Sequence, residues 1–167
     1  MSTAPRRMPA ARRLGLGIAA ALIGAGALSG CVSTEVAAPY TPGIGINAEQ
    51  QGVNLRAVTV VAKDGKGVLA GSLDSASGDT LTAIKGSATG SNFEDLGALQ
   101  TGSTTIQLPA GTFVNLTEKK IALSSDDLVP GLYARLTFTF EKAGELTVLV
   151  PVVDADQPDY ASAQPQG

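Results

Sequence analysis

Alternation between apolar and polar residues is the strongest pattern in the chain, and it is clearest near the C-terminal end. Residues 132–141 have an apolar side chain at every even position and mainly polar side chains at the odd positions. A period of two places one set on the buried face of a β-strand and the other on the solvent face. The pattern resumes over residues 145–152, after Lys142-Ala143-Gly144, a short turn with a glycine that tolerates positive φ. We therefore predict a β-hairpin over residues 132–152.

Earlier segments show shorter runs of the same kind. Residues 53–62 are predicted to form a strand that ends at the turn 63–67 and buries Val53, Leu55, Ala57 and Val61. Residues 86–102, rich in Ser, Thr and Gly, are long for a connection and are predicted to be a mobile loop. Short strands without a helical stripe predict an all-β protein, an antiparallel sandwich of about seven to nine strands. The remaining strands are expected at residues 67–73, 80–84, 104–108, 113–116 and 120–123.

The first 30 residues follow a different pattern. An apolar run from Leu14 to Leu28 comes after four arginines and ends at Leu28-Ser29-Gly30-Cys31. This is the layout of a secretory signal. About 15 apolar residues are fewer than the roughly 20 that a membrane-spanning helix needs, and several glycines weaken a helix further. The ending resembles a bacterial lipobox, which implies cleavage before Cys31 and acylation of its thiol and its new amino terminus.

These patterns divide the chain into four parts. Residues 1–30 are expected to be a lipoprotein signal peptide, and residues 31–43, with Ser, Thr and Pro, a lipidated tether. Residues 44–153 are expected to form the β-sandwich domain, and residues 154–167, which lack an apolar stripe, a disordered tail. We expect the extracytoplasmic face of the cell membrane as the location, because two or more acyl chains on Cys31 anchor a protein firmly.

The expected mature chain is acidic. Four of the 12 Lys and Arg residues precede Cys31 and all 15 Asp and Glu residues follow it, which leaves a net charge of −7. Such a surface repels nucleic acid and anionic lipid headgroups, so neither is an expected partner and the lipid alone is expected to hold the chain at the membrane. Cys31 is the sole cysteine. No intramolecular disulfide can form, and the fold depends on an aliphatic core.

Four features follow one another over residues 104–153. They are the turn Leu108-Pro109-Ala110-Gly111, the strand Ile121-Ala122-Leu123, the turn Leu128-Val129-Pro130-Gly131, and a hairpin from Leu136 to Gly144 that continues into Val150-Pro151-Val152. In this order they resemble the periplasmic copper chaperone family of the PCuAC type, and the chain is also similar to small actinobacterial surface lipoproteins of the Lpq series. The resemblance implies a Greek-key sandwich that is cupredoxin-like or immunoglobulin-like.

The copper chemistry of that family is not matched by the residues of this chain. Copper(I) is a soft ion that prefers thioether and imidazole donors. The resemblance implies a His-x-Met pair after the Pro-Ala-Gly turn, where this chain has Lys120 and Ala122, which we expect on the polar face of a strand. Glu94 and Asp95 are the candidates for the second pair, and they are hard donors. The sequence has no His, and both Met residues precede Cys31. We therefore expect Lys120 and Ala122 to be degenerate metal positions, with no metal and no cofactor bound.

Other chemistry has weaker support in the sequence. Without His or a free Cys there is no ordinary catalytic triad or thiol nucleophile, and acidic pairs such as Asp126-Asp127 are typical of solvated loops. We therefore predict no enzymatic activity. Calcium takes six to eight oxygen ligands, but the segment from Asp74 to Asp79 does not follow the spacing of a calcium loop and is expected to be a plain turn.

The leading hypothesis is a non-catalytic protein-interaction module of the cell envelope. It would keep a copper-chaperone-like scaffold without the copper ligands and would bind another, unknown envelope protein through its surface. Two alternatives remain open at this point. One is a copper-handling accessory lipoprotein that uses unusual ligands, and the other is a binder of an apolar envelope lipid between the sheets.

Overall fold

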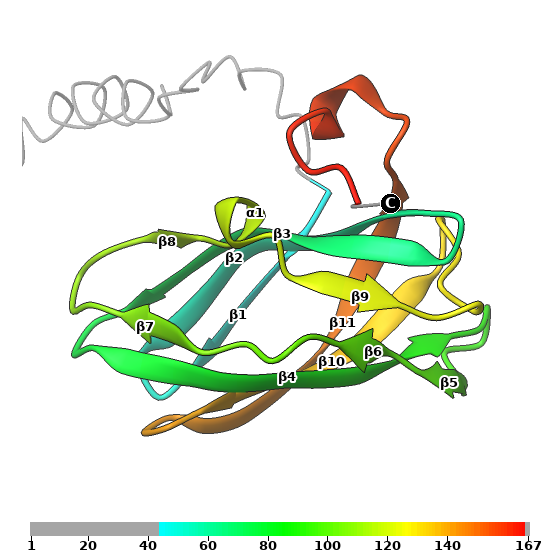
Figure 1. The fold of residues 1–167 in the computed structure, drawn as a ribbon. Coiled ribbons are helices and arrows are strands. Elements are labelled where there is room, and N and C mark those ends of the chain that lie inside the picture. Colours follow the sequence, from blue (N-terminus) through cyan, green and yellow to red (C-terminus); the bar gives the residue numbers. More distant parts are fainter. Residues whose placement is uncertain (1–43, 166–167) are drawn as a thin grey trace, which may run out of the picture. The chain divides into compact units, whose positions relative to one another are not determined.

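The computed structural model describes residues 44–165, which form a β-sandwich with one short helix (Figure 1). The predictions for residues 1–43, including lipidation of Cys31, and for residues 166 and 167 lie outside the described residues. The helical elements are α1 (Leu116–Lys119) and the 3-10 turn η1 (Pro158–Tyr160). The strands are β1 (Ile46–Gln50), β2 (Val53–Lys63), β3 (Lys66–Ser75), β4 (Asp79–Thr89), β5 (Asp95–Ala98), β6 (Gln100–Thr101), β7 (Ile106–Leu108), β8 (Val114–Asn115), β9 (Ala122–Ser124), β10 (Tyr133–Phe140) and β11 (Gly144–Asp154).

Two layers share strand β11. One layer has the order β5-β4-β10-β11 and the other the order β11-β2-β3-β9-β6. The part of β11 before Val152 pairs antiparallel with β10, whereas Val152–Asp154 pair parallel with β2. The neighbours β4 and β10, and β11 and β2, are far apart in sequence, as in a Greek-key sandwich. The predicted all-β, cupredoxin-like fold class is therefore confirmed.

The hairpin of β10 and β11 agrees with its prediction. Phe138 lies opposite Leu146 and Leu136 opposite Val148, in continuous antiparallel register. The even-numbered side chains of β10 are buried, and Gly144 has a φ of +76° after the turn. Both runs alternate without interruption and lie next to each other in the sequence, so the local pattern was sufficient to predict the pairing.

Strand β2 departs from its prediction because a β-bulge interrupts it. Ala57 has a φ of +49° and is exposed, and the register with β3 shifts between Arg56 and Thr59. One extra residue reverses which face the following side chains point to. Ala57 and Val61 therefore do not share the buried face of Val53 and Leu55 as predicted, and Val58, Val60 and Ala62 continue the main core instead. Val61 belongs to a second apolar cluster.

Residues 86–102 are not the mobile loop that their composition suggests. Strand β4 extends to Thr89, and β5 and β6 follow within the same stretch. The Leu99 N–H donates to the Gly86 carbonyl at 2.9 Å, and Leu99 is buried. A further strand, β1, was not predicted, although Ile46 and Ala48 alternate with polar residues within it.

The predicted strands at 113–116 and 120–123 are separated by a helix. Asn115 caps α1, because its side-chain oxygen accepts the Thr117 N–H at 2.9 Å. Leu116 is fully buried, whereas β8 and β9 are shorter than predicted. A helix of four residues is too short to produce a recognisable apolar stripe.

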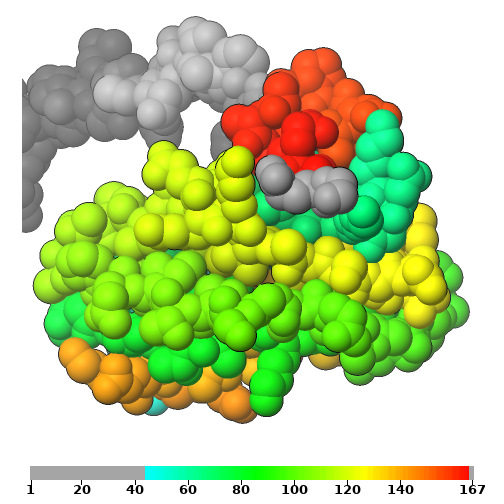
Figure 2. All heavy atoms as spheres, in the orientation of Figure 1, coloured from blue at the N-terminus to red at the C-terminus, as the bar shows by residue number. Residues whose placement is uncertain are grey.

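Residues 155–165 fold against the outer face of β2 and β3, although disorder was predicted from residue 154 onward. Ala155 and Ala163 are buried with Val61, Val68 and Val153 in the second apolar cluster. Figure 2 shows this C-terminal segment, in orange and red, as a ridge beside the β2–β3 end of the domain. Two alanines and a tyrosine supply its apolar contacts, which is too little hydrophobicity for a sequence pattern to reveal.

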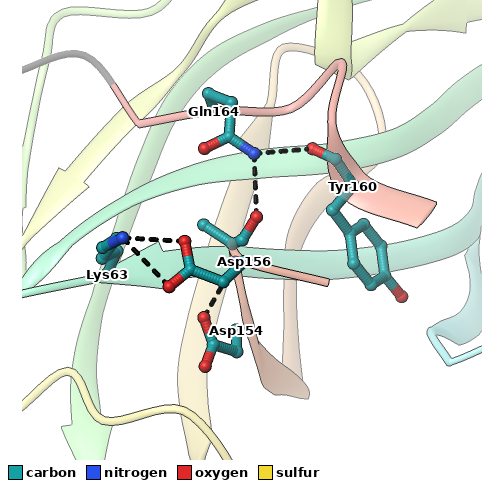
Figure 3. Close-up of polar contacts among 6 residues, drawn as sticks. Lys63, Asp154, Asp156, Tyr160 and Gln164 are labelled. Atoms are coloured by element: carbon teal, nitrogen blue, oxygen red, sulfur yellow. Dashed lines mark hydrogen bonds and ion pairs between the residues drawn. The ribbon is translucent and has the colours of Figure 1, made fainter. Parts of the chain in front are cut away.

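Polar contacts hold the same segment in place (Figure 3). The Lys63 ammonium lies 2.7 Å from the Asp156 carboxylate, and this hydrogen bond and the nearby negative charge raise the pKa of Lys63. The Gln164 amide donates to the backbone carbonyls of Ala155 and Tyr160 at 2.8 and 3.1 Å. The start of the segment is therefore bonded to β2 through Lys63, and its end is bonded back to Ala155 and Tyr160 through Gln164.

Candidate functional site

The two positions expected to have lost copper ligands lie on either side of a buried residue. Lys120 is the C-cap of α1, in a left-handed conformation with φ +48°, and its N–H donates to the Thr117 carbonyl at 3.3 Å. Ala122 begins β9, and both side chains are exposed, whereas Ile121 between them is buried. Both residues were predicted on the polar face of a strand; both are exposed, but Lys120 precedes the strand because α1 occupies that part of the chain.

Ala122 lines a shallow groove of about 440 Å³ between β3, β6 and β9. Lys66, Gln100 and Thr101 also line the groove, which is open to solvent. A methyl group and an ammonium cannot bind a soft cation. The residues at the two positions therefore do not fit copper(I).

Glu94 and Asp95, the other candidate pair, take part in local hydrogen bonds of the opposite layer. The Glu94 carboxylate accepts the Asn92 N–H at 3.0 Å. Asp95 accepts the Ser87 hydroxyl at 2.8 Å and the Arg135 guanidinium at 3.0 Å, which together lower the pKa of Asp95. Within residues 44–165, no three or more His, Cys, Asp or Glu side chains are grouped so that they could hold a metal ion.

Asp74 and Asp79, which were considered as oxygen ligands for calcium, have structural partners instead. Asp74 accepts the Asn54 amide and the Arg56 guanidinium, each at 2.8 Å, across β2 and β3. Asp79 is buried and accepts the backbone N–H groups of Thr80, Lys142 and Ala143 at 2.7 to 3.0 Å. Burial alone would raise the pKa of Asp79, but these three donors outweigh it and lower the pKa.

Exposed aromatic residues form a feature that the sequence interpretation missed. Phe93, in the β4–β5 connection, and Tyr133, at the start of β10, have ring centroids 5.4 Å apart at a tilt of 54°. Leu96 on β5 is also exposed. The sequence offered one sign of this feature, a single aromatic residue, Phe93, within the Ser-, Thr- and Gly-rich residues 86–102. We name Phe93, Leu96, Tyr133 and the backbone of β5 the β5 edge.

The β5 edge is held in a defined geometry. Phe93 has a φ of +63°, a conformation that bulky residues rarely adopt. Its N–H donates to the Gly90 carbonyl at 3.0 Å, and its own carbonyl accepts the Arg135 guanidinium at 3.0 Å. Arg135 also holds Asp95. This arrangement has no apparent chemistry for catalysis, but it presents rigid aromatic area to solvent, which suits binding to another molecule.

None of the helices within the described part of the chain is long and apolar enough to cross a bilayer.

Comparison with known proteins relates the fold to one kind of domain. No family model matches the chain, and no curated protein matches it significantly. Among solved structures, it is similar to the apo PCuAC domain from PmoF1, with a TM-score of 0.52 and 14% identity over 65% of this chain and 99% of that one. It is also similar to the apo PmoF2 PCuAC domain, with a TM-score of 0.51 and 19% identity over 67% of this chain and 98% of that one. At these identities the likeness shows the fold alone, a PCuAC-like scaffold.

Proposed function

We propose that this chain is a lipid-anchored protein of the extracytoplasmic face of the cell membrane that binds another envelope protein. It does so with a PCuAC-like scaffold, without copper and without catalysis. One observation carries the proposal: the scaffold resembles PCuAC domains, while Lys120 and Ala122 stand where the family resemblance implies copper ligands and the sequence contains no His. What the scaffold contributes is therefore its surface.

The location in this proposal depends on the N-terminal sequence. The lipobox-like Leu28-Ser29-Gly30-Cys31 supports acylation of Cys31. The net charge of −7 after residue 31 disfavours attachment through anionic headgroups. Membrane attachment through two or more acyl chains is stable without a charged patch.

Crosslinking in intact host cells tests the binding role. A photoreactive residue introduced at exposed positions of the full chain should give one or a few reproducible protein adducts in the envelope fraction. Adducts should depend on position, because a specific interface covers only part of the surface. A survey of exposed positions over both layers that yields no reproducible protein adduct would contradict the proposal.

Copper titration tests the claim that the metal site is degenerate. The purified full chain, titrated with copper(I) against a competing chelator, should bind no stoichiometric copper at micromolar or tighter affinity, because Lys120 and Ala122 offer no soft donor. The double variant Lys120→His, Ala122→Met supplies the imidazole and thioether of the family pair, and we expect it to bind copper(I) more tightly than the wild type. Tight, stoichiometric binding by the wild type would favour the copper-handling alternative.

A further inference from the structure

Strand β5 lies at the end of its layer. In the strand order it pairs with β4 on one side, and the order stops there. An edge strand presents unpaired backbone N–H and C=O groups, which makes it a template for a strand from another chain. Its four residues, Asp95 to Ala98, include neither Lys nor Pro, the residues that commonly protect an edge.

Exposed apolar side chains concentrate at the same place. Six large apolar residues are exposed within residues 44–165, and three of them, Phe93, Leu96 and Tyr133, belong to the β5 edge. Phe93 is 48% exposed and Leu96 is 50% exposed. Phenylalanine, tyrosine and arginine are enriched at protein–protein interfaces. A partner strand on β5 would bring its own side chains over these residues.

The backbone that carries Phe93 is held in place before any partner binds. The left-handed Phe93 is retained by a closed connection, in which the Gly90 N–H donates to the Glu94 carbonyl at 2.9 Å and Arg135 binds the Phe93 carbonyl. Residues held in sparsely populated backbone conformations concentrate at binding sites. A side chain that is already ordered loses less entropy when it binds.

Charge indicates what kind of partner fits. Glu94 and Asp95 directly follow Phe93 in the chain and are exposed, and Asp127 lies against Gly97 of β5. The nearby cation, Arg135, is already paired with Asp95. A second copy of this chain would place these carboxylates against each other, so pairing of two β5 edges is disfavoured, whereas a basic segment is attracted.

We propose that the β5 edge binds an extended, basic segment of a partner protein, which adds to β5 as a strand and covers Phe93, Leu96 and Tyr133. This inference rests on the proposed binding function and identifies its surface. The backbone of β5 supplies the strand pairing, the apolar side chains supply the contact area, and the carboxylates select lysine or arginine at the flanks.

The test begins with peptide selection. A display library of random 10-residue peptides is selected on the immobilised full chain in detergent micelles, and the recovered peptides are synthesised and titrated. We expect sequences that alternate apolar residues with Lys or Arg. Methylation of one of the two alternate sets of backbone nitrogens in such a peptide, the set that faces β5, should abolish binding, because it removes the strand hydrogen bonds. An acidic consensus, or unchanged binding by both of the alternately methylated peptides, would overturn the proposal.

Matched variants locate the site on the protein. Phe93→Asn removes the ring but tolerates the left-handed backbone, so the fold should persist, and its melting temperature is measured to verify this. We expect it to weaken peptide binding at least about tenfold, as for a central interface residue. Phe113→Asn is the control, because Phe113 is another exposed phenylalanine, which stacks against Arg56 elsewhere on the domain. It should change binding by less than about twofold.

Failure of the site can be distinguished from failure of the function. If crosslinked partner adducts form equally well in cells that carry Phe93→Asn, the β5 edge is not the binding surface. The proposed binding role would remain intact. Absence of any protein adduct with the wild type would overturn the binding role itself. Self-association of the wild type that Phe93→Asn abolishes would also overturn the proposal, since it would identify a second copy as the occupant.

Discussion

At the scale of single residues, Asp79 shows how one carboxylate connects two turns that are distant in sequence. It stands where the β3–β4 turn ends, and it accepts the Lys142 and Ala143 N–H groups of the β10–β11 turn. Its two oxygens thereby satisfy donors that the hairpin turn would otherwise leave unpaired. The Lys142 ammonium also donates to the Gly78 carbonyl at 2.8 Å. The two turns are therefore joined by the Asp79 carboxylate and by this second hydrogen bond.

Replacing Asp79 should destabilise the protein at neutral pH. In Asp79→Asn the amide NH₂ replaces one accepting oxygen and faces a backbone donor, which should lower the free energy of unfolding by about 1.5–3 kcal/mol. The native pKa of Asp79 is lowered, so its contribution is fully present above the ordinary carboxyl pKa of about 3.9 and is lost as the pH falls through the lower native value. Urea unfolding of both proteins at neutral and acidic pH measures this, and the difference should shrink in acid.

Asp64→Asn provides the matched control for that experiment. Asp64 is an exposed residue of the β2–β3 turn with a φ of +51°, which asparagine also accepts. It should change the free energy of unfolding by less than about 0.5 kcal/mol. Equal effects of the two substitutions, or a difference for Asp79→Asn that does not depend on pH, would contradict the assigned role of Asp79.

The role of a single carboxylate could not be predicted from the sequence. Asp79 was grouped with Asp74 as a candidate cation ligand, because two of its three hydrogen-bond donors lie more than 60 residues further along the chain. Lys120 and Ala122 were placed correctly on an exposed side, since alternation around the buried Ile121 is a local property. The expectation that the chain does not bind copper(I) followed from the composition alone, because the sequence has no His.

At the scale of elements, the bulge in β2 decides which residues form the core. The backbone of Ala57 and Val58 bulges toward Gly71 of β3, which has a φ of +120°. A Cβ atom at Gly71 would lie 2.9 Å from the Ala57 carbonyl oxygen and 2.9 Å from the Val58 Cα. Only glycine fits this approach, and the Gly71 N–H faces the Thr117 hydroxyl at 3.4 Å. The bulge in β2 therefore requires a glycine at position 71 of β3.

A side chain at Gly71 should disrupt this pairing. We expect Gly71→Ala to lower the free energy of unfolding by about 1–3 kcal/mol, because both the backbone conformation and the contact with β2 become strained. Gly102→Ala is the matched control, since no heavy atom lies within 4 Å of a Cβ built there. Urea unfolding compares the two variants. A Gly71→Ala protein as stable as Gly102→Ala would show that the bulge relaxes without cost.

Elements differed in how well the sequence predicted them. The β10–β11 hairpin was predictable because its alternation and its turn are continuous along the chain. Strand β2 was predicted to exist, but its burial pattern was wrong after residue 57, since a bulge changes the phase of the alternation without leaving a recognisable motif. The C-terminal segment is ordered by a few tertiary contacts, such as Lys63 with Asp156, that no local pattern encodes.

At the scale of the whole molecule, the proposed function assigns separate roles to the domain and to the N-terminal anchor. In that proposal the sandwich binds a partner through its surface, and acylated Cys31 keeps that surface within reach of envelope proteins. The fold class was predictable from the regular spacing of short strands, and the likeness to PCuAC domains agrees with it. The β5 edge was not predicted, because the rings of Phe93 and Tyr133 meet only when β4 pairs with both β5 and β10.

The last prediction concerns the attachment of the domain to the membrane. Because the chain after residue 31 carries a net charge of −7, adsorption to anionic lipid is repulsive, and the proposal therefore attributes membrane retention to acyl chains on Cys31. We expect washing of host membranes with high salt or alkaline buffer to leave the chain in the membrane fraction, and detergent to release it. Metabolic labelling with palmitate should mark the wild type but not Cys31→Ala, whether or not the variant leader is cleaved. Release by salt alone, or a free Cys31 thiol in the membrane-bound protein, would contradict the lipid anchor and would require a protein receptor to hold the domain in place.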